Sequence, residues 1–379
     1  MIISSRHVIG PDGSAGPATI TIEADRIVDV APGVLDAEHE VDEWILPGYV
    51  DTHCHGAAGA NFSDPDPDKV RAAIAYHRSQ GATTLFASTV TEDMDDLVDQ
   101  IGRIRKFCAA GELDGIHLEG PFLAESRKGA HNIDLLRDPT PGRVSRLLDA
   151  GGEDLRMITL APERRCGIEA VQTIAAAGVH AAFGHSEADA ATARDAVDSG
   201  ADIVTHLFNA MAPIHHRKPG PVPWMLTDSR VMCELICDGV HLAPDVIRMA
   251  VQAAGPERIG LVTDAMSATG QPDGDYMLGS LAVRVVNGSA RLLNPDGSLG
   301  AIAGSTLTLG RAVEFVVSTV GIPLPQAAMM ASTTPARWHG LDAGVIAAGR
   351  RADLCLTSGT GHLQRVIRAG REVRAADPR

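Results

Sequence analysis

Two histidines, His53 and His55, close an apolar segment that begins at Ile45. Residues at i and i+2 of an extended segment point to the same side, so both imidazoles can reach one metal ion at the end of a strand. Further candidates each follow an apolar, strand-like run: Glu119, His185, His206 and Asp264. Imidazoles combined with a carboxylate suit Zn²⁺ or Fe²⁺. We therefore predict a divalent metal centre of one or two ions, with Zn²⁺ as the first expectation and Fe²⁺ as the alternative.

The expected chemistry is hydrolysis. A bound divalent cation lowers the pKa of water toward neutrality and makes hydroxide available at physiological pH. Asp264 is predicted to lie across from the imidazoles, where its carboxylate can accept the water's proton and pass it to a leaving group. Cys54 faces away from the two histidines and is predicted to pack in the core. His117 is predicted to fill the barrel interior, with a place in the site as the alternative.

Because these residues are far apart in the chain, they can form one site only in a fold that brings the ends of several strands together. Helical patterns with apolar spacing of three and four residues, such as Leu97, Ile101 and Ile104, separate the strand-like runs. Eight strands in this alternation are typical of a (β/α)8 barrel, whose functional residues gather at the carboxyl ends of the strands. The segment Gln271–Gly300 interrupts the rhythm with Gly-Asp, Asn-Gly and Asp-Gly turns and is predicted to be a β insertion. The predicted barrel strands are Tyr49–His53, Thr83–Ser88, Gly115–Leu118, Arg156–Leu160, Val179–Phe183, Ile203–His206, Met232–Cys237 and Ile259–Thr263.

Both ends of the chain carry short β patterns, for example Ala18–Glu23 and Arg365–Val373. Neither end is long enough to bury a core of its own. We therefore predict an α/β protein in which both termini build one small β-sandwich around an inserted barrel. The expected division is residues 1–47 and 336–379 for the β-sandwich and residues 48–335 for the barrel.

The composition of the chain argues against some classes of binding partner. The chain has 379 residues, a formal net charge of -15 and only 3% aromatic residues, which argues against nucleic acid and anionic membranes as partners. We see no signal peptide and no apolar run of membrane-spanning length. The six cysteines form no CxxC pair. A cytoplasmic enzyme acting on a small molecule is the expectation.

Several motifs carry a family resemblance. Glu-Gly-Pro-Phe at 119–122, Gly-Ala-His-Asn at 129–132 and His-Leu-Phe-Asn-Ala-Met at 206–211 resemble the N-acetylglucosamine-6-phosphate deacetylase branch of the amidohydrolase superfamily. The run Gly-Val-Ile-Ala-Ala-Gly-Arg-Arg-Ala-Asp-Leu at 344–354 is similar to the superfamily's small-domain signature. The resemblance implies hydrolysis of the acetamide of N-acetylglucosamine 6-phosphate to glucosamine 6-phosphate and acetate, in amino-sugar catabolism and recycling.

The resemblance also implies metal-binding roles. Glu119, His185 and His206 correspond to the ligands of the principal metal. Because this chain keeps His53 and His55, a second metal position is implied. The fourth strand is followed by Ala-Pro-Glu at 161–163, without the lysine that bridges two metals in many other amidohydrolases. Glu119 is therefore the expected bridge.

Substrate-binding roles follow from the same resemblance. His131 corresponds to the residue that polarises the acetyl carbonyl. Asn209 and Ala210 correspond to phosphate contacts, and His241 completes the sugar-phosphate pocket. The basic run His-His-Arg-Lys at 215–218 suits a phosphate in an otherwise acidic protein. Arg217 is implied to reach the phosphate in a neighbouring subunit, which predicts a homodimer.

Three alternatives remain open from the residues. One is a deacetylase of an epimeric N-acetylhexosamine 6-phosphate. Another is a glycoside hydrolase that uses Glu119 and Asp264 as paired carboxylates, although this leaves four strand-end histidines without a role. The third is a non-catalytic protein that binds metal or senses a sugar phosphate, against which Asp264 speaks, because binding alone needs no proton acceptor.

Overall fold

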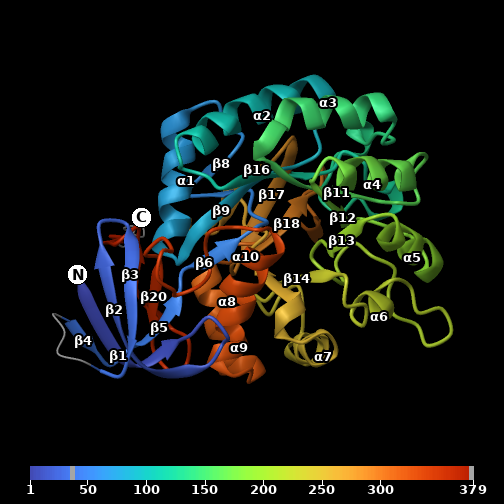
Figure 1. Ribbon diagram of the computed structural model, residues 1–379. Coiled ribbons are helices and arrows are strands. Elements are labelled where there is room, and N and C mark those ends of the chain that lie inside the picture. The colour runs from blue at the N-terminus through green and yellow to red at the C-terminus, as the bar shows by residue number, and fades with distance from the viewer. Residues whose placement is uncertain (35–38, 375–379) are drawn as a thin grey trace.

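Eight parallel strands form the central barrel in the computed structural model, which describes residues 1–34 and 39–374 (Figure 1). Each corresponds to one predicted strand. Between the first and the last, the backbone N–H of Asp264 donates to the carbonyl of His53 at 2.8 Å, and that of His55 donates to Ala265 at 2.8 Å. These bonds join the two edges at the carboxyl end, so the predicted barrel is confirmed. The strands, in sheet order, are β6 (Tyr49–Asp51), β9 (Ala82–Thr89), β10 (Gly115–Glu119), β11 (Leu155–Leu160), β12 (His180–Phe183), β13 (Ala201–Val204), β14 (Met232–Ile236) and β15 (Ile259–Val262).

Helices cover the outside of the barrel (Figure 1). Helix α1 begins after Asp66, whose side chain accepts the backbone N–H of Asp68, and its chain leaves through Gly81 at φ +98°. The apolar stripe of α2 (Leu97, Ile101 and Ile104) is fully buried, as the spacing predicts. The α-helices are α1 (Pro67–Ser79), α2 (Met94–Ala109), α3 (Pro141–Gly151), α4 (Gly167–Ala176), α5 (Ala190–Asp198), α6 (Val222–Met225), α7 (Pro244–Ala254), α8 (Leu309–Phe315), α9 (Leu324–Ala328) and α10 (Thr334–Trp338).

Irregular helices complete the outer layer. Two π-helices, Val316–Val320 and Met329–Thr333, continue α8 and α9. The first of them has its apolar residues Val316 and Val320 fully buried. Short 3-10 turns occur at Glu125–Arg127, Ile133–Leu135, Gly152–Asp154 and Pro256–Arg258.

The two ends of the chain build one small β domain beside the barrel, as predicted (Figure 1). The C-terminal strand β20 pairs antiparallel with β5. The core of this small domain includes Ile20, Ile45 and Leu354. The exact domain boundaries stay a prediction. The strands are β1 (Ile2–Ile9), β2 (Ala15–Glu23), β3 (Arg26–Pro32), β4 (His39–Val41), β5 (Trp44–Pro47), β20 (Leu354–Thr357), β21 (Leu363–Arg368) and β22 (Arg371–Glu372).

The predicted insertion is a four-stranded antiparallel sheet: β16 (Gly274–Leu278), β17 (Leu281–Val286), β18 (Ser289–Leu293) and β19 (Leu299–Ile302). Its apolar residues pack on Ala130 and Met266, which places Leu278 and Ile302 beside the barrel mouth. A small hairpin, β7 (Gly56–Ala57) with β8 (Ala60–Asn61), follows the first barrel strand. Among the described residues, no helix is long and apolar enough to span a membrane.

Candidate active site

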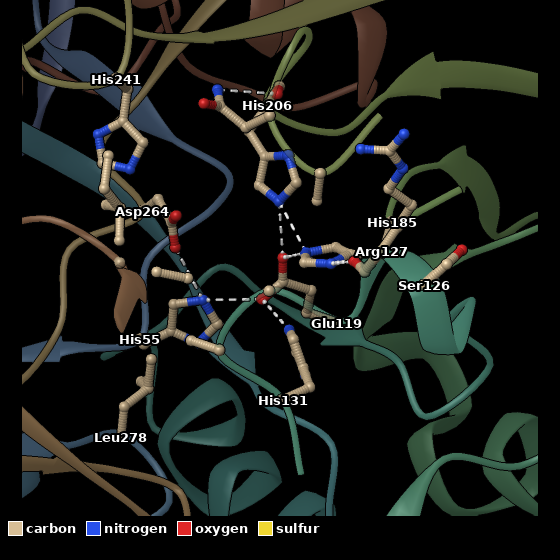
Figure 2. Close-up of a pocket in the computed structure, with 17 residues that line it drawn as sticks. His55, Glu119, Ser126, Arg127, His131, His185, His206, His241, Asp264 and Leu278 are labelled. Atoms are coloured by element: carbon tan, nitrogen blue, oxygen red, sulfur yellow. Dashed lines mark hydrogen bonds and ion pairs between the residues drawn. The ribbon is translucent and has the colours of Figure 1, made fainter. Parts of the chain in front are cut away.

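A cavity of about 330 Å³ opens where the carboxyl ends of the barrel strands meet (Figure 2). Residues from several strands and from the Gly-Ala-His-Asn loop converge on it, as a barrel enzyme requires. The lining includes most of the predicted site residues: His55, Glu119, His131, His185, His206, Asn209, Ala210, His241 and Asp264.

Three site residues share an unusual backbone position. His185, His206 and Asp264 each stand two residues beyond the end of a strand, and their φ angles are +49°, +30° and +49°. Left-handed backbone costs energy for a residue with a side chain, and the surrounding structure must impose it. Such strained positions cluster at functional sites, and here they turn each side chain toward the cavity.

One donor set is centred on Glu119. Its Oε1 lies 3.0 Å from Nε2 of His185 and 2.9 Å from Nε2 of His206. The two imidazole nitrogens lie 3.0 Å apart. Nitrogen ligands of a tetrahedral Zn²⁺ are separated by roughly 3.3 Å, because each bond is about 2.0–2.1 Å long. The type and spacing of these atoms therefore fit one divalent metal ion.

A second donor set lies beside the first. Nε2 of His53 and Nε2 of His55 are 3.3 Å apart, and Oδ1 of Asp264 lies 3.5 Å and 3.1 Å from them. The other oxygen of Glu119, Oε2, is 3.3 Å from Nε2 of His55. Glu119 therefore directs one oxygen to each set. Asp264, to which we assigned the role of proton acceptor, also lies close enough to His53 and His55 to share a metal ion with them.

Hydrogen bonds on the far side of the rings fix two tautomers. Nδ1 of His185 donates to the carbonyl of Arg127 at 2.8 Å, and Nδ1 of His53 donates to Oε2 of Glu234 at 3.1 Å. In the neutral form of both rings the proton is therefore on Nδ1, and Nε2 keeps the lone pair that a metal requires. Nδ1 of His55 and Nδ1 of His206 are buried without a partner among the described residues.

The carboxylates of the site are held in the ionised form. Burial alone raises the pKa of Glu119, but His53 and His131 outweigh it and hold that pKa well below its usual value. Burial likewise opposes ionisation of Asp264, yet His53 and His55 lower its pKa. Both side chains are therefore charged at neutral pH, as a ligand and a proton acceptor must be.

His131 presents an N–H group to the cavity. The backbone N–H of Thr91 donates to Nδ1 of His131 at 3.3 Å, so Nδ1 is an acceptor and the proton of the neutral ring is on Nε2. Burial lowers the pKa of His131 to about 4, which keeps the ring neutral. Nε2 of His131 lies 3.4 Å from Oε2 of Glu119 and faces the cavity (Figure 2).

The predicted phosphate contacts divide into two groups. Asn209, Ala210 and His241 line the cavity, and Nδ1 of His241 donates to Asp238 at 2.7 Å. Arg217 does not line it: its guanidinium donates to Nε2 of His216 at 2.6 Å, on an exposed loop. Within one chain, therefore, Arg217 stands apart from the site.

The remaining candidates lie inside the protein. His117 is buried in the barrel between the hydroxyls of Ser88 and Thr159, 2.9 Å and 2.8 Å away. Sγ of Cys54 is buried against Nε2 of His77, 3.1 Å away. These positions match the interior packing that we predicted for both residues.

Two carboxylates of the site were missed by sequence reasoning. Glu234 is fully buried in strand β14 and accepts a hydrogen bond from Nδ1 of His53. Glu163 accepts the hydroxyl of Ser186 at 2.7 Å and the backbone N–H of Glu187 at 2.6 Å, which supports the turn after His185. A charged residue inside the apolar run Met232–Ile236 was the one available signal for Glu234.

A (β/α)8 barrel with buried imidazoles and carboxylates at its mouth defines a metal-dependent hydrolase of the barrel type. The comparisons agree, because residues 44–373 match the model of the amidohydrolase family. This chain belongs to the amidohydrolase family, which generally uses a divalent metal, and its described residues include groups of His, Asp and Glu side chains that could hold one.

Two relatives illustrate the similarity in sequence. The chain is 32% identical over 371 residues to an N-acetylgalactosamine-6-phosphate deacetylase of Escherichia coli O157:H7, covering 96% of this chain and 97% of that protein. It is 33% identical over 335 residues to an N-acetylglucosamine-6-phosphate deacetylase of Vibrio furnissii, covering 87% of this chain and 82% of that protein.

Solved structures are also similar. A variant of N-acetyl-D-glucosamine-6-phosphate deacetylase from Mycobacterium smegmatis, in complex with N-acetyl-D-glucosamine 6-phosphate, has a TM-score of 0.94 and 44% identity, over 98% of this chain and 99% of that chain. The corresponding enzyme of Thermotoga maritima has a TM-score of 0.89 and 30% identity, over 99% and 100% of the two chains. The predicted resemblance and fold are thereby confirmed.

Proposed function

We propose that this protein hydrolyses the acetamide of N-acetylglucosamine 6-phosphate and releases acetate and glucosamine 6-phosphate, in amino-sugar catabolism and recycling. One observation carries the proposal: a single cavity holds a metal-ligand set, a neutral N–H donor and an ionised carboxylate. These are the parts that amide hydrolysis needs. The relatives and the complexed structure name this substrate, or its galactosamine epimer, for their own proteins.

The metal would be held by Glu119, His185 and His206, with His53 and His55 as a second position. Glu119 reaches both sets of imidazoles and is the proposed bridge. When bound, a divalent cation supplies a Lewis acid and lowers the pKa of water. We propose Zn²⁺, with Fe²⁺ as the alternative, because the donors are imidazoles and carboxylates.

The protein's own groups perform the proton transfers. His131 donates a hydrogen bond from its Nε2–H to the carbonyl oxygen of the acetyl group, and this bond stabilises the negative charge that develops there. Asp264 accepts a proton from water as the water oxygen bonds to the carbonyl carbon. The same proton then passes to the amide nitrogen as the C–N bond breaks, which releases the amine and acetic acid. The acid then gives up the second proton of the water, so the final products are acetate and the protonated amine.

Substrate recognition involves the remaining cavity residues. We propose that Asn209, the backbone of Ala210 and His241 bind the sugar phosphate from within the subunit. Arg217 lies on an exposed loop and would complete the phosphate site of a neighbouring subunit in a homodimer. An arginine suits this role because its planar fork matches phosphate geometry.

The galactosamine epimer is a specific second candidate, because the relative from Escherichia coli O157:H7 matches 96% of this chain. The test is acetate release from the 6-phosphates of N-acetylglucosamine, N-acetylgalactosamine and N-acetylmannosamine, and from unphosphorylated N-acetylglucosamine. Metal content is measured on the same preparation. We expect the highest kcat/KM for N-acetylglucosamine 6-phosphate and loss of activity after chelation. A higher value for the galactosamine epimer would reassign the substrate, and full activity in a metal-free preparation would refute the mechanism.

A further inference from the structure

Glu234 is a carboxylate in the middle of a buried strand. Strand β14 has the sequence Met-Cys-Glu-Leu-Ile, and all five residues are buried. The side chain of Glu234 has no exposure to solvent. A carboxylate in such a place is costly unless charged or polar donors surround it, so its partners indicate why the chain keeps it there.

The side chain of Glu234 contacts one residue of each donor set, and also Thr52. Oε2 accepts Nδ1–H of His53 at 3.1 Å and the backbone N–H of His206 at 3.4 Å. Oε1 accepts the hydroxyl of Thr52 at 3.3 Å. The bond to His53 decides the tautomer of that ring and points Nε2 at Glu119 and Asp264, 3.7 Å and 3.5 Å away.

We propose that Glu234 is a positioning residue that presents His53 as a metal ligand and thereby determines whether the His53–His55 position retains a second cation. The inference rests on the proposed metal-dependent function, but it concerns binding and not turnover. Partners of this kind behind a ligating imidazole orient the ring and increase its basicity. Their loss typically lowers metal affinity about 10- to 100-fold.

A main-chain contact of Glu234 allows the positioning role of its side chain to be tested apart from a purely structural role of the residue. Its carbonyl accepts the backbone N–H of Leu207 at 2.8 Å. That bond holds strand β14 to the turn after His206 and survives any substitution of the side chain. A change at the side chain therefore acts on His53, Thr52 and the weaker contact to His206, and the effect on metal content can be assigned to them.

Two variants and a control test the proposal. Glu234→Met removes the acceptor but keeps a similar volume, whereas Glu234→Gln keeps one oxygen for His53 and turns its amide toward the hydroxyl of Thr52. Asp353→Asn is the control, because Asp353 is a buried carboxylate of the small β domain whose partners are Arg351 and Ala369. Each protein is loaded with Zn²⁺ and freed of excess. Metal per chain is then measured by plasma mass spectrometry, and both Zn²⁺ affinities by chelator competition.

We expect two ions in the unchanged protein and in Asp353→Asn. Glu234→Met should lose affinity for one of the two ions by at least tenfold. Glu234→Gln should lose roughly threefold to tenfold, because a neutral acceptor makes a weaker hydrogen bond than a carboxylate. Retention of the principal ion in both variants, together with partial rescue by glutamine, would support a positioning role.

Three results would overturn the proposal. They are one ion in the unchanged protein at every Zn²⁺ concentration, unchanged affinity for both ions in folded Glu234→Met, or unchanged affinity in Glu234→Gln. The last result applies even if the methionine variant fails to fold. Acetate release is measured separately, so a protein that binds two ions but deacetylates no sugar would refute the proposed function and leave the inference on Glu234 intact.

Discussion

The backbone N–H of Thr91 donates to Nδ1 of His131 at 3.3 Å, and this contact places the ring proton of His131 on the nitrogen that faces the cavity. A backbone amide can only donate, so the tautomer follows without assumptions about hydroxyl orientation. The pKa of His131 is lowered to about 4, chiefly by burial, which keeps this neutral form through the physiological range.

His131→Asn should therefore impair catalysis and leave metal binding intact. Loss of a preorganised donor to a developing oxyanion typically costs about 10²–10³-fold in kcat. Steady-state acetate release, with metal content determined in parallel, measures the effect. The control is Asn132→Ala, which alters the neighbouring side chain and should change kcat far less. A fall in metal content equal to the fall in kcat would instead make His131 a ligand.

Asp264→Asn tests the proton acceptor. The variant keeps the shape of the side chain but cannot take a proton, so kcat should fall by at least about 10²–10⁴-fold. The ion held by Glu119, His185 and His206 should remain. Unchanged turnover would remove Asp264 from the mechanism. Loss of one ion would assign it a ligand role as well, which its 3.1 Å distance from His55 permits.

Substitutions in the two donor sets should have different effects on metal content. Glu119→Gln or His206→Gln should lower total metal content along with activity, because both residues contribute to the principal set. The double change His53→Asn and His55→Asn should remove one ion and leave the other. Metal content after dialysis distinguishes these outcomes. A double variant without any bound metal would contradict the division into a principal and an accessory position.

The strand ends were predictable from the sequence because a local pattern encodes them. An apolar run of strand length predicts where a parallel strand ends, and the barrel rule places the polar residues just beyond that end at the mouth. His185, His206 and Asp264 follow this rule closely, each two residues after its strand. The helical spacing of α1 and α2 was predictable for the same reason.

Contacts between distant segments were not predictable in this way. Glu234 lies 181 residues from His53 in the chain, and no local pattern links the two. The partner of His185 is the carbonyl of Arg127, a backbone atom that leaves no mark on residue type. The position of the Asp264 side chain beside His55 depends on the left-handed backbone at Asp264 after β15. The sequence Thr-Asp-Ala does not indicate that conformation.

His77 should make stability depend on pH. It is fully buried on α1, and burial lowers its pKa to about 4 from an ordinary value of 6.5. Because the folded pKa lies below the unfolded one, the unfolded chain binds more protons as the pH falls. The free energy of unfolding should therefore decrease between about pH 6.5 and pH 4, by up to about 3 kcal/mol from this residue.

His77→Gln isolates this contribution, because its amide can still donate toward the carbonyl of Gly56, which Nε2 of His77 contacts at 2.9 Å. Both proteins share the histidines of the metal site, so the difference between their unfolding free energies removes those contributions. Urea unfolding at several pH values should show the unchanged protein losing stability relative to the variant below pH 6.5. A difference that is constant with pH would show that His77 does not titrate in this window.

Arg217→Ala should reduce selectivity for the phosphorylated sugar without affecting the chemistry of hydrolysis. A hydrogen bond to a charged group contributes roughly 1.5–3 kcal/mol, so kcat/KM for the 6-phosphate should fall at least tenfold. Activity toward the unphosphorylated sugar should hardly change. Lys218→Ala, in the same exposed loop, is the matched control and should have a smaller effect, because a lysine lacks the bidentate fork of arginine.

Mixing two impaired variants tests whether Arg217 acts across a dimer. Arg217→Ala and Asp264→Asn subunits, once exchanged, form hybrid dimers in which one site has an intact Asp264 and an intact Arg217 from its neighbour. Acetate release from the mixture should then exceed the sum of the separate proteins. This expectation follows from the place of Arg217 outside the cavity of its own chain. If verified subunit exchange restores no activity, each site must be complete within one subunit, and any phosphate contact of Arg217 must come from movement of its own loop.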